Sequence, residues 1–307
     1  MRRNLWLGGR AIRGISTLSA LLALAATTAC TQSAEDHLRA AQDAIYLGDP
    51  RRALNEYERA AELAARENST RAPFVQARAL RGAADVCYLE LREPARAAGI
   101  YRRLIRIHPE RPEALEARVN LARILRSDLH DLRGAIAELA AAIARQPPWA
   151  AALRYEMAKL YFELGDYRQS ALEAEAILQR YGTSAIAARA NFLKAEALAM
   201  IDGRSSEAIS ALEQLLERFP DSELEPHVLY QLGRLRAEAG DLEAAIEQWV
   251  LALKMHPNPS FIQSAISRAR KRLEQASASD RVAEALIANA VFDGLSTLRD
   301  AELQLVP

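Results

Sequence analysis

The sequence predicts an all-α protein, an α-solenoid of about six helix-turn-helix units with capping helices at its C-terminus. A small residue recurs at intervals of about 37 residues, a period typical of repeat arrays. A bulky side chain follows four residues later in most copies, and a proline follows twelve residues later in four of them. Each unit of such an array buries its apolar face against its neighbours, so the period itself predicts a stack of helices. The six recurring positions are Ala53, Ala97, Ala135, Ser170, Ala208 and Ala245.

The composition agrees with a helical protein. The chain has 307 residues, of which 13 are glycine, 12 are proline and 26% are charged, a balance that favours helices over sheet or disorder. Basic and acidic side chains are equal in number, 40 of each, and four of the arginines lie in the first 29 residues. The rest of the chain is therefore slightly acidic, which gives no reason to expect a nucleic acid as partner.

Residues 1–29 have the pattern of a secretory signal peptide. Four arginines occupy the first thirteen positions, and the apolar stretch Ile15–Ala29 follows and ends in small residues. This stretch is too short to span a bilayer comfortably. The Ala29-Cys30 junction resembles a bacterial lipoprotein signal, in which the cysteine becomes the acylated first residue of the mature chain.

The lipoprotein resemblance implies a membrane anchor on Cys30, with residues 30–33 as a tether. Because Thr31 rather than aspartate follows the cysteine, it also implies the periplasmic face of the cell outer membrane. Two alternatives stay open: ordinary cleavage near Ala29, which would leave a soluble periplasmic protein, and an uncleaved anchor. The second cysteine, Cys87, lies in an apolar stretch and is expected to be buried without a disulfide.

Each repeat is expected to contain two helices joined by a glycine turn. In the last unit the apolar residues of Val228–Leu235 recur at helical spacing, and Gly240-Asp241 then interrupts them. Glycine can take the left-handed conformation that closes a helix, and aspartate can cap the next one. A second apolar stripe then predicts the second helix of that unit, ended by His256-Pro257; its residues are Leu242, Ala245, Ile246, Trp249 and Leu253. The same junction occurs at Gly48-Asp49 and Gly165-Asp166.

The C-terminal part predicts a helical cap and a tail. A helix over residues 259–276 carries Arg268, Arg270, Lys271 and Arg272 on its polar side, as the open end of a stack requires. These cations are expected to be solvated; a patch for anionic lipid or nucleic acid is the alternative. Residues 276–280 suggest a hinge, and residues 277–307 an amphipathic helical tail that folds back on the array or docks on a partner.

The combined pattern resembles the tetratricopeptide repeat. The resemblance covers residues 34–258 in six units, and implies a right-handed α-solenoid whose first helices line a concave, protein-binding groove. Carried over position by position, it places in that groove the partner-binding candidates Gln42, Tyr46, Asn120, Tyr155, Lys159, Tyr230 and Arg234. Aromatic and long polar side chains could hold a peptide there by stacking and hydrogen bonding. For each of them the alternative is a solvent-facing residue with no binding role.

No pattern in the sequence points to catalysis, a cofactor or a metal. The five histidines are scattered, and none has cysteine or a carboxylate at metal-ligand spacing. Glycine-rich phosphate loops, nucleophile elbows and paired catalytic carboxylates do not stand out either. We therefore expect a protein that is not an enzyme, has no cofactor or metal, and acts on no small-molecule substrate.

Two turns suggest a cellular role. Arg180–Ser184 and Arg218–Ser222 resemble turns in lipoproteins of the β-barrel assembly machinery and of the Tol–Pal envelope system. The resemblance implies a scaffold or adaptor that mediates protein–protein interactions in assembly of the cell envelope. The alternatives are a pilotin-like lipoprotein for secretin assembly, a regulator of peptidoglycan or exopolysaccharide synthesis, and a cytoplasmic scaffold.

Overall fold

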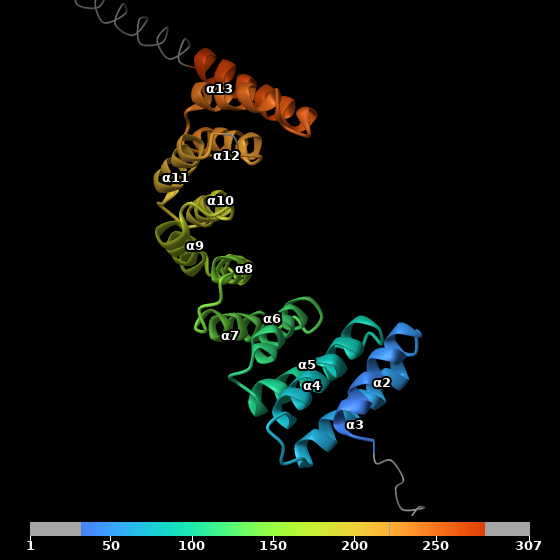
Figure 1. The fold of residues 1–307 in the computed structure, drawn as a ribbon. Coiled ribbons are helices and arrows are strands. Elements are labelled where there is room, and N and C mark those ends of the chain that lie inside the picture. The colour runs from blue at the N-terminus through green and yellow to red at the C-terminus, as the bar shows by residue number, and fades with distance from the viewer. Residues whose placement is uncertain (1–31, 221, 280–307) are drawn as a thin grey trace, which may run out of the picture. The chain divides into compact units, whose positions relative to one another are not determined.

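A computed structural model describes residues 32–220 and 222–279 (Figure 1). The signal segment, Cys30 and the tail from residue 280 lie outside these ranges, so the predictions made for them remain predictions. Helices make up the regular structure of the described ranges, which contain no strand. The chain divides into two compact units, Met1–Leu129 and His130–Pro307.

Unit 1 is a succession of helices, each packed on the next. The first helices of its repeats, α2, α4 and α6, also contact one another in order, so they form one layer. The helices are α2 (Ala34–Tyr46), α3 (Pro50–Arg66), α4 (Ala72–Leu89), α5 (Pro94–Ile107) and α6 (Pro112–Ser127).

Unit 2 repeats this arrangement. Each labelled helix packs on the one that follows, and α8 also contacts α10, as an α-solenoid requires. The predicted all-α solenoid is thereby confirmed. The helices are α7 (Leu132–Ile143), α8 (Ala150–Glu163), α9 (Tyr167–Tyr181), α10 (Ala187–Ala199), α11 (Ser205–Arg218), α12 (Glu225–Glu238) and α13 (Leu242–Leu253), followed by helical residues 259–279.

The turns within the repeats have the predicted backbone chemistry. Gly240 lies in the left-handed region with φ +92°, where a side chain would be strained. Asp241 then caps α13, because its side chain accepts a hydrogen bond from the Ala244 backbone N–H at 3.1 Å. Gly48 with φ +74° and Asp49 do the same before α3.

The recurring small residues are buried in the interior of their units. All six have 0% of their surface exposed, and the bulky residues that follow four positions later, Tyr101 and Trp249 among them, are buried as well. A small side chain brings two helix axes close, and the bulky one fills the groove beside it. Burial of both positions therefore explains the repeat in the sequence.

The helix at the C-terminal end of unit 2 is longer than predicted. Its apolar side, which includes Ile262 and Ala265, packs on α12 and α13 beside Trp249. The sequence suggested a hinge from residue 276, whereas the helix continues through residue 279. Ser277 and Ser279 each donate a hydrogen bond back to a carbonyl one turn earlier. Such back-bonding lets serine remain inside a helix, so the short polar run does not break it.

Candidate functional site

The first helices of unit 2 carry side chains in matching register. One column contains Tyr155 of α8, Phe192 of α10 and Tyr230 of α12, and continues with Arg268 of the last helix; its members are about 38 residues apart, the repeat period. The neighbouring column contains Lys159, Glu196, Arg234 and Arg272. These eight residues define what we call the inner face of unit 2.

A cavity of about 390 Å³ lies on the inner face between α8 and α10. Tyr155 and Lys159 form its α8 side, with the lysine Nζ 5.4 Å from the centroid of the tyrosine ring. Arg189 and Phe192 line it from α10, and Leu224 closes it near the start of α12. Burial raises the pKa of the Tyr155 phenol, and the charge of Glu156 adds to the shift, so this tyrosine stays neutral. An aromatic and cationic hollow of this kind can stack on apolar side chains and donate hydrogen bonds.

Glu196 lies further along the same face. Burial raises the pKa of its carboxyl, and the positive charge of Arg234 on α12 partly offsets that shift. The charge of Glu196 also acts on Tyr155.

A second cavity, of about 230 Å³, lies between α12 and the last helix. Tyr230 and Trp249 form its aromatic part, with their rings stacked at 6.4 Å between centroids. Arg234 of α12 lines it and forms an ion pair with Glu238 at 2.9 Å. Arg268 and Arg272 line its other side. The structure thus brings two predicted residues, Tyr230 and Arg234, together with two arginines that sequence reasoning assigned to a solvated cap.

The remaining predicted residues lie in unit 1. Gln42 and Tyr46 are exposed on the last turns of α2, and 92% of the Tyr46 surface is accessible. Asn120 on α6 is half-buried; its amide donates to the Tyr101 hydroxyl at 3.3 Å and accepts from Arg123 at 3.1 Å. Its hydrogen bonds are thus made within the unit.

Unit 1 contains a polar network that the sequence did not reveal. Tyr101 donates a short hydrogen bond to Asp85, and Arg81 lies 3.6 Å from the same carboxyl and pairs with Glu116. Burial raises the pKa of Asp85, against the opposing effects of the Tyr101 hydroxyl and Arg81. Only the spacing of Arg81 and Asp85, one helical turn apart, hints at it in the sequence. The network joins α4, α5 and α6, and we assign it a structural role.

In unit 2 the sequence analysis missed Arg189, Phe192, Glu196, Arg268 and Arg272. A signal for most of them exists, because advancing from Tyr155 or Lys159 by one repeat reaches the next member of each column. The first helices match the repeat pattern weakly, and the last helix was treated as a cap outside the array. The columns therefore became visible only in the folded chain.

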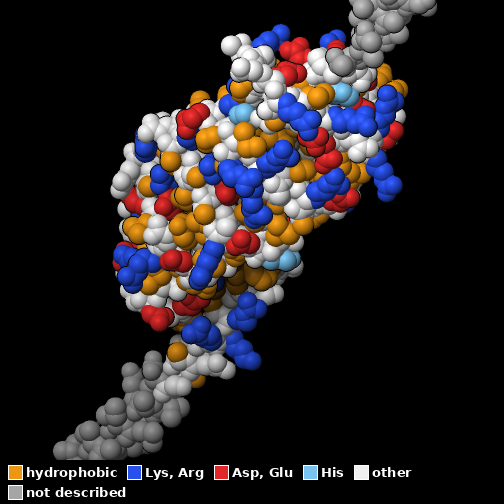
Figure 2. Space-filling model, turned by 90° about the horizontal axis from the view of Figure 1, so that it is seen from below, with side chains coloured by type: hydrophobic (Ala, Val, Ile, Leu, Met, Phe, Trp, Pro, Cys, Tyr) orange, Lys and Arg blue, Asp and Glu red, His pale blue; other side chains and the backbone are white. Residues whose placement is uncertain are grey.

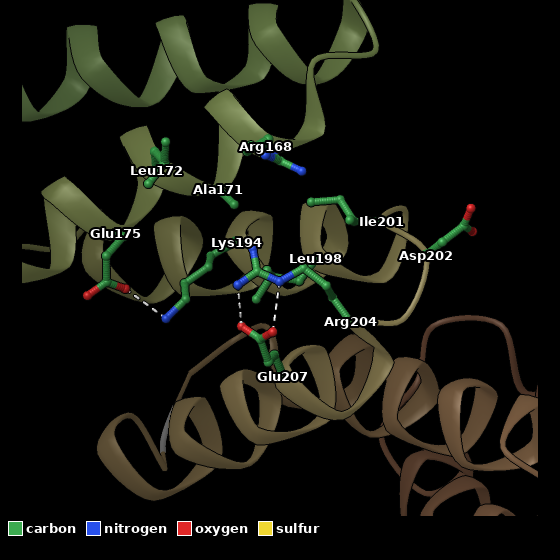
Figure 3. Close-up of a pocket in the computed structure, with 10 residues that line it drawn as sticks. All are labelled: Arg168, Ala171, Leu172, Glu175, Lys194, Leu198, Ile201, Asp202, Arg204 and Glu207. Atoms are coloured by element: carbon green, nitrogen blue, oxygen red, sulfur yellow. Dashed lines mark hydrogen bonds and ion pairs between the residues drawn. The ribbon is translucent and has the colours of Figure 1, made fainter.

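A larger cavity, of about 600 Å³, lies among α9, α10 and α11 and has a different character (Figure 3). Lys194 pairs with Glu175 at 2.7 Å, and Arg204 binds both oxygens of Glu207 at 2.7 Å. Figure 3 shows the Glu175–Lys194 pair joining α9 to α10 and the Arg204–Glu207 pair at the start of α11. Because these charges neutralise one another, this cavity is a weaker candidate for a charged partner than the inner face.

On the face shown in Figure 2, the distribution of charged side chains does not indicate a further binding site. Figure 2 shows basic and acidic side chains interspersed with apolar ones over the face that it presents. Among residues 32–220 and 222–279, no group of three or more His, Cys, Asp or Glu side chains is arranged to hold a metal ion. In the same ranges no helix has both the length and the apolar character needed to cross a bilayer.

A family model described as the tetratricopeptide repeat matches residues 38–112, 88–148, 155–221 and 202–260, more than half of the chain. The chain belongs to the tetratricopeptide repeat family. Repeats of this family typically serve as scaffolds for protein–protein interactions, which suggests a protein partner for this tetratricopeptide repeat protein. A search of curated proteins finds no match.

Several solved structures are similar to this tetratricopeptide repeat protein. The C-terminal part of a repeat protein from Cytophaga hutchinsonii is 14% identical with a TM-score of 0.58, over 81% of this chain and 93% of that one. A repeat protein from Parabacteroides merdae is 16% identical with a TM-score of 0.43, over 78% and 100%. YrrB, a repeat protein with an unusual peptide-binding site, is 16% identical with a TM-score of 0.46, over 61% and 90%. At these identities the likeness concerns the fold alone.

Proposed function

We propose that this protein is an adaptor of cell-envelope assembly, anchored by lipid to the periplasmic face of the outer membrane, which holds a segment of a partner protein on the inner face of unit 2. The observation that carries the proposal is the pair of cavities on that face. Together they offer the aromatic rings of Tyr155, Phe192 and Tyr230 at intervals of one repeat. Rigid aromatic side chains are the residues that most often dominate protein interfaces.

The anchoring part of the proposal rests on residues 1–33. A basic start, a short apolar stretch and small residues precede Cys30, the order expected of an exported lipoprotein. The helix α2 begins at Ala34, three positions after Thr31, and Ser33 caps it. The Ser33 backbone N–H donates to the Asp36 carboxylate at 3.0 Å, and the Asp36 backbone N–H donates to the Ser33 hydroxyl at 3.2 Å. An acyl chain on Cys30 would therefore hold α2 close to the membrane surface, since three residues span about 10 Å at most.

The intact mass of the protein, purified from detergent-solubilised envelopes of producing cells, tests the anchor. We expect a chain that begins at Cys30 and carries acyl chains. A chain that begins at Cys30 without acyl groups would instead indicate a soluble periplasmic protein. Recovery of the uncleaved, unmodified chain from the cytosol would contradict the proposed location.

A pull-down from the same envelopes tests the adaptor role. We expect subunits of the barrel-assembly machinery to be recovered with the wild-type chain and lost with the double variant Tyr155→Ala/Phe192→Ala. Leu172→Ala is a matched control, because Leu172 is an exposed apolar residue in the cavity of Figure 3. Recovery of a secretin instead would favour the pilotin-like alternative. Equal recovery by all three chains would remove the inner face from the proposal.

A further inference from the structure

We infer that the cavity between α12 and the last helix makes the inner face selective for an acidic segment of the partner. The inference rests on the proposed function, because it names the chemistry of the segment that the inner face would hold. Three arginines, Arg234, Arg268 and Arg272, line this cavity with a single carboxylate, that of Glu238. An acidic side chain entering it would therefore meet an excess of positive charge.

The two arginines of the last helix are available to a ligand. Arg268 and Arg272 are exposed, and neither makes a hydrogen bond or ion pair with any residue in the described part of the chain. They lie four positions apart, so both face the cavity from one side of their helix. The same helix also lines the cavity with the small side chains of Ala265 and Ala269, which leave room for a bound group.

Arg234 differs from them because it is already oriented. Its guanidinium forms an ion pair with Glu238 at 2.9 Å and donates a hydrogen bond to the Gln231 side-chain oxygen at 2.7 Å. A held guanidinium presents its remaining N–H groups in a fixed plane, which suits the two oxygens of a carboxylate. One preorganised arginine and two that have no partner among the described residues thus line the same hollow.

The other two cavities have a smaller excess of positive charge. Three cations meet three carboxylates in the lining of the cavity of Figure 3, and two cations meet one carboxylate between α8 and α10. In the cavity of Figure 3 both Lys194 and Arg204 are satisfied by carboxylates of the protein itself. Arg270 and Lys271 belong to the same helix as the two unpaired arginines but do not line the cavity. The excess charge therefore belongs to the position in the groove and not to the helix as a whole.

The shape of the site favours a peptide over a membrane surface. The arginines border a hollow of about 230 Å³ with Tyr230 and Trp249 at its side. A flat array of lipid headgroups cannot enter such a hollow, whereas one or two side chains of a peptide can. In the next cavity along the inner face Lys159 is paired with Glu156 at 2.8 Å, beside the rings of Tyr155 and Phe192. We therefore expect the excess of acidic residues at the Arg268 end of the bound segment and apolar residues at the other.

Selection of binders from a random peptide library by the purified full chain tests this inference. We expect the wild-type protein to select peptides rich in Asp and Glu. The variant Arg268→Ala/Arg272→Ala should lose this enrichment and bind the wild-type selected peptides about tenfold more weakly at low salt, an effect that added salt reduces. Arg268→Lys/Arg272→Lys should retain most of the enrichment, because it keeps the charge.

The matched control is Arg270→Ala/Lys271→Ala, which removes the same charge from the same helix outside the cavity. We expect it to change the affinity less than about twofold. Circular dichroism of each variant checks that the helices remain folded. Equal losses in the control and the test variant would overturn the inference, because net charge and not the cavity would then be responsible.

The remaining outcomes separate this inference from the proposed function. Selected peptides without acidic enrichment would overturn the selectivity and leave the inner face as a peptide-binding surface. Failure to select any peptide would contradict both. If the two alanine substitutions abolish binding to phosphatidylglycerol vesicles but leave peptide selection unchanged, the arginines serve a lipid surface, and the inference is wrong.

Discussion

The indole Nε1 of Trp249 donates a hydrogen bond to the backbone carbonyl of Tyr230, with 3.0 Å between nitrogen and oxygen. The bond joins α13 to α12 where the two helices approach over Gly233. A Cβ atom on Gly233 would lie 2.5 Å from the Trp249 Nε1. The same contact shapes the aromatic side of the second cavity, so the packing of this helix pair and the proposed binding surface depend on one small residue.

Gly233→Ala should destabilise unit 2. The added methyl group must push Trp249 aside and weaken its bond to Tyr230, and overpacking of this kind costs about 1–3 kcal/mol. Urea unfolding followed by circular dichroism measures the free energy of unfolding. Gly99→Ala is the control, because no atom lies within 4 Å of a Cβ at Gly99 in α5; there alanine should be neutral or stabilising. Equal effects at the two positions would contradict the close approach at Gly233.

Asp241→Ala should weaken the start of α13. The Asp241 carboxylate accepts the Ala244 amide at 3.1 Å, and loss of a helix cap costs about 0.5–2 kcal/mol. Asp241→Asn should recover most of the loss, since asparagine caps helices equally well. Asp202→Ala offers a comparison, because the exposed Asp202 caps no helix in the described chain. The free energy of unfolding should fall only for Asp241→Ala.

Glu196→Gln should change how stability depends on pH. Burial raises the pKa of Glu196 in the folded chain, so the folded state holds this proton more tightly than the unfolded state. The contribution of Glu196 to the free energy of unfolding therefore decreases as the pH rises from about 4.5 through the raised pKa. We expect Glu196→Gln to be more stable than wild type near neutral pH, with the advantage shrinking in acid.

Urea unfolding at a series of pH values between about 4 and 7 measures this effect. Glu247→Gln, at an exposed position of α13, should follow the wild-type curve throughout. An advantage of Glu196→Gln that grows as pH falls would show that the charged form of Glu196 is stabilised in the fold, against our expectation.

Cys87 should be unreactive in the native chain. It is fully buried in α4, and burial raises the pKa of its thiol to about 11. At pH 8 a thiol of this kind is about a thousandth ionised, and only the thiolate reacts readily. In a Cys30→Ser variant, we expect a maleimide to label Cys87 only when urea unfolds unit 1. Fast labelling of the native variant would show that α4 opens locally.

The local elements could be predicted from the sequence with good accuracy. Gly240 and Asp241 specify a helix end and a helix start through their own backbone preference and side chain, and both behave as expected. The buried small residues follow from the repeat period, since every unit packs its helices against its neighbours in the same way. Such signals act over a few residues along the chain, which is why the helical hairpins can be read from composition and spacing.

Which side chains make up the inner face depends on how successive first helices, about 38 residues apart in the sequence, pack beside one another. Asn120 fitted the groove pattern, yet the Tyr101 hydroxyl lies within reach of its amide. Arg268 and Arg272 are exposed, as expected of a solvated cap, and they also line a cavity with Tyr230 and Arg234. The sequence by itself determined the helix pairs, their turns and their buried small residues. Only the tertiary structure decided which side chains share a cavity, because that depends on the register in which one repeat packs on the next.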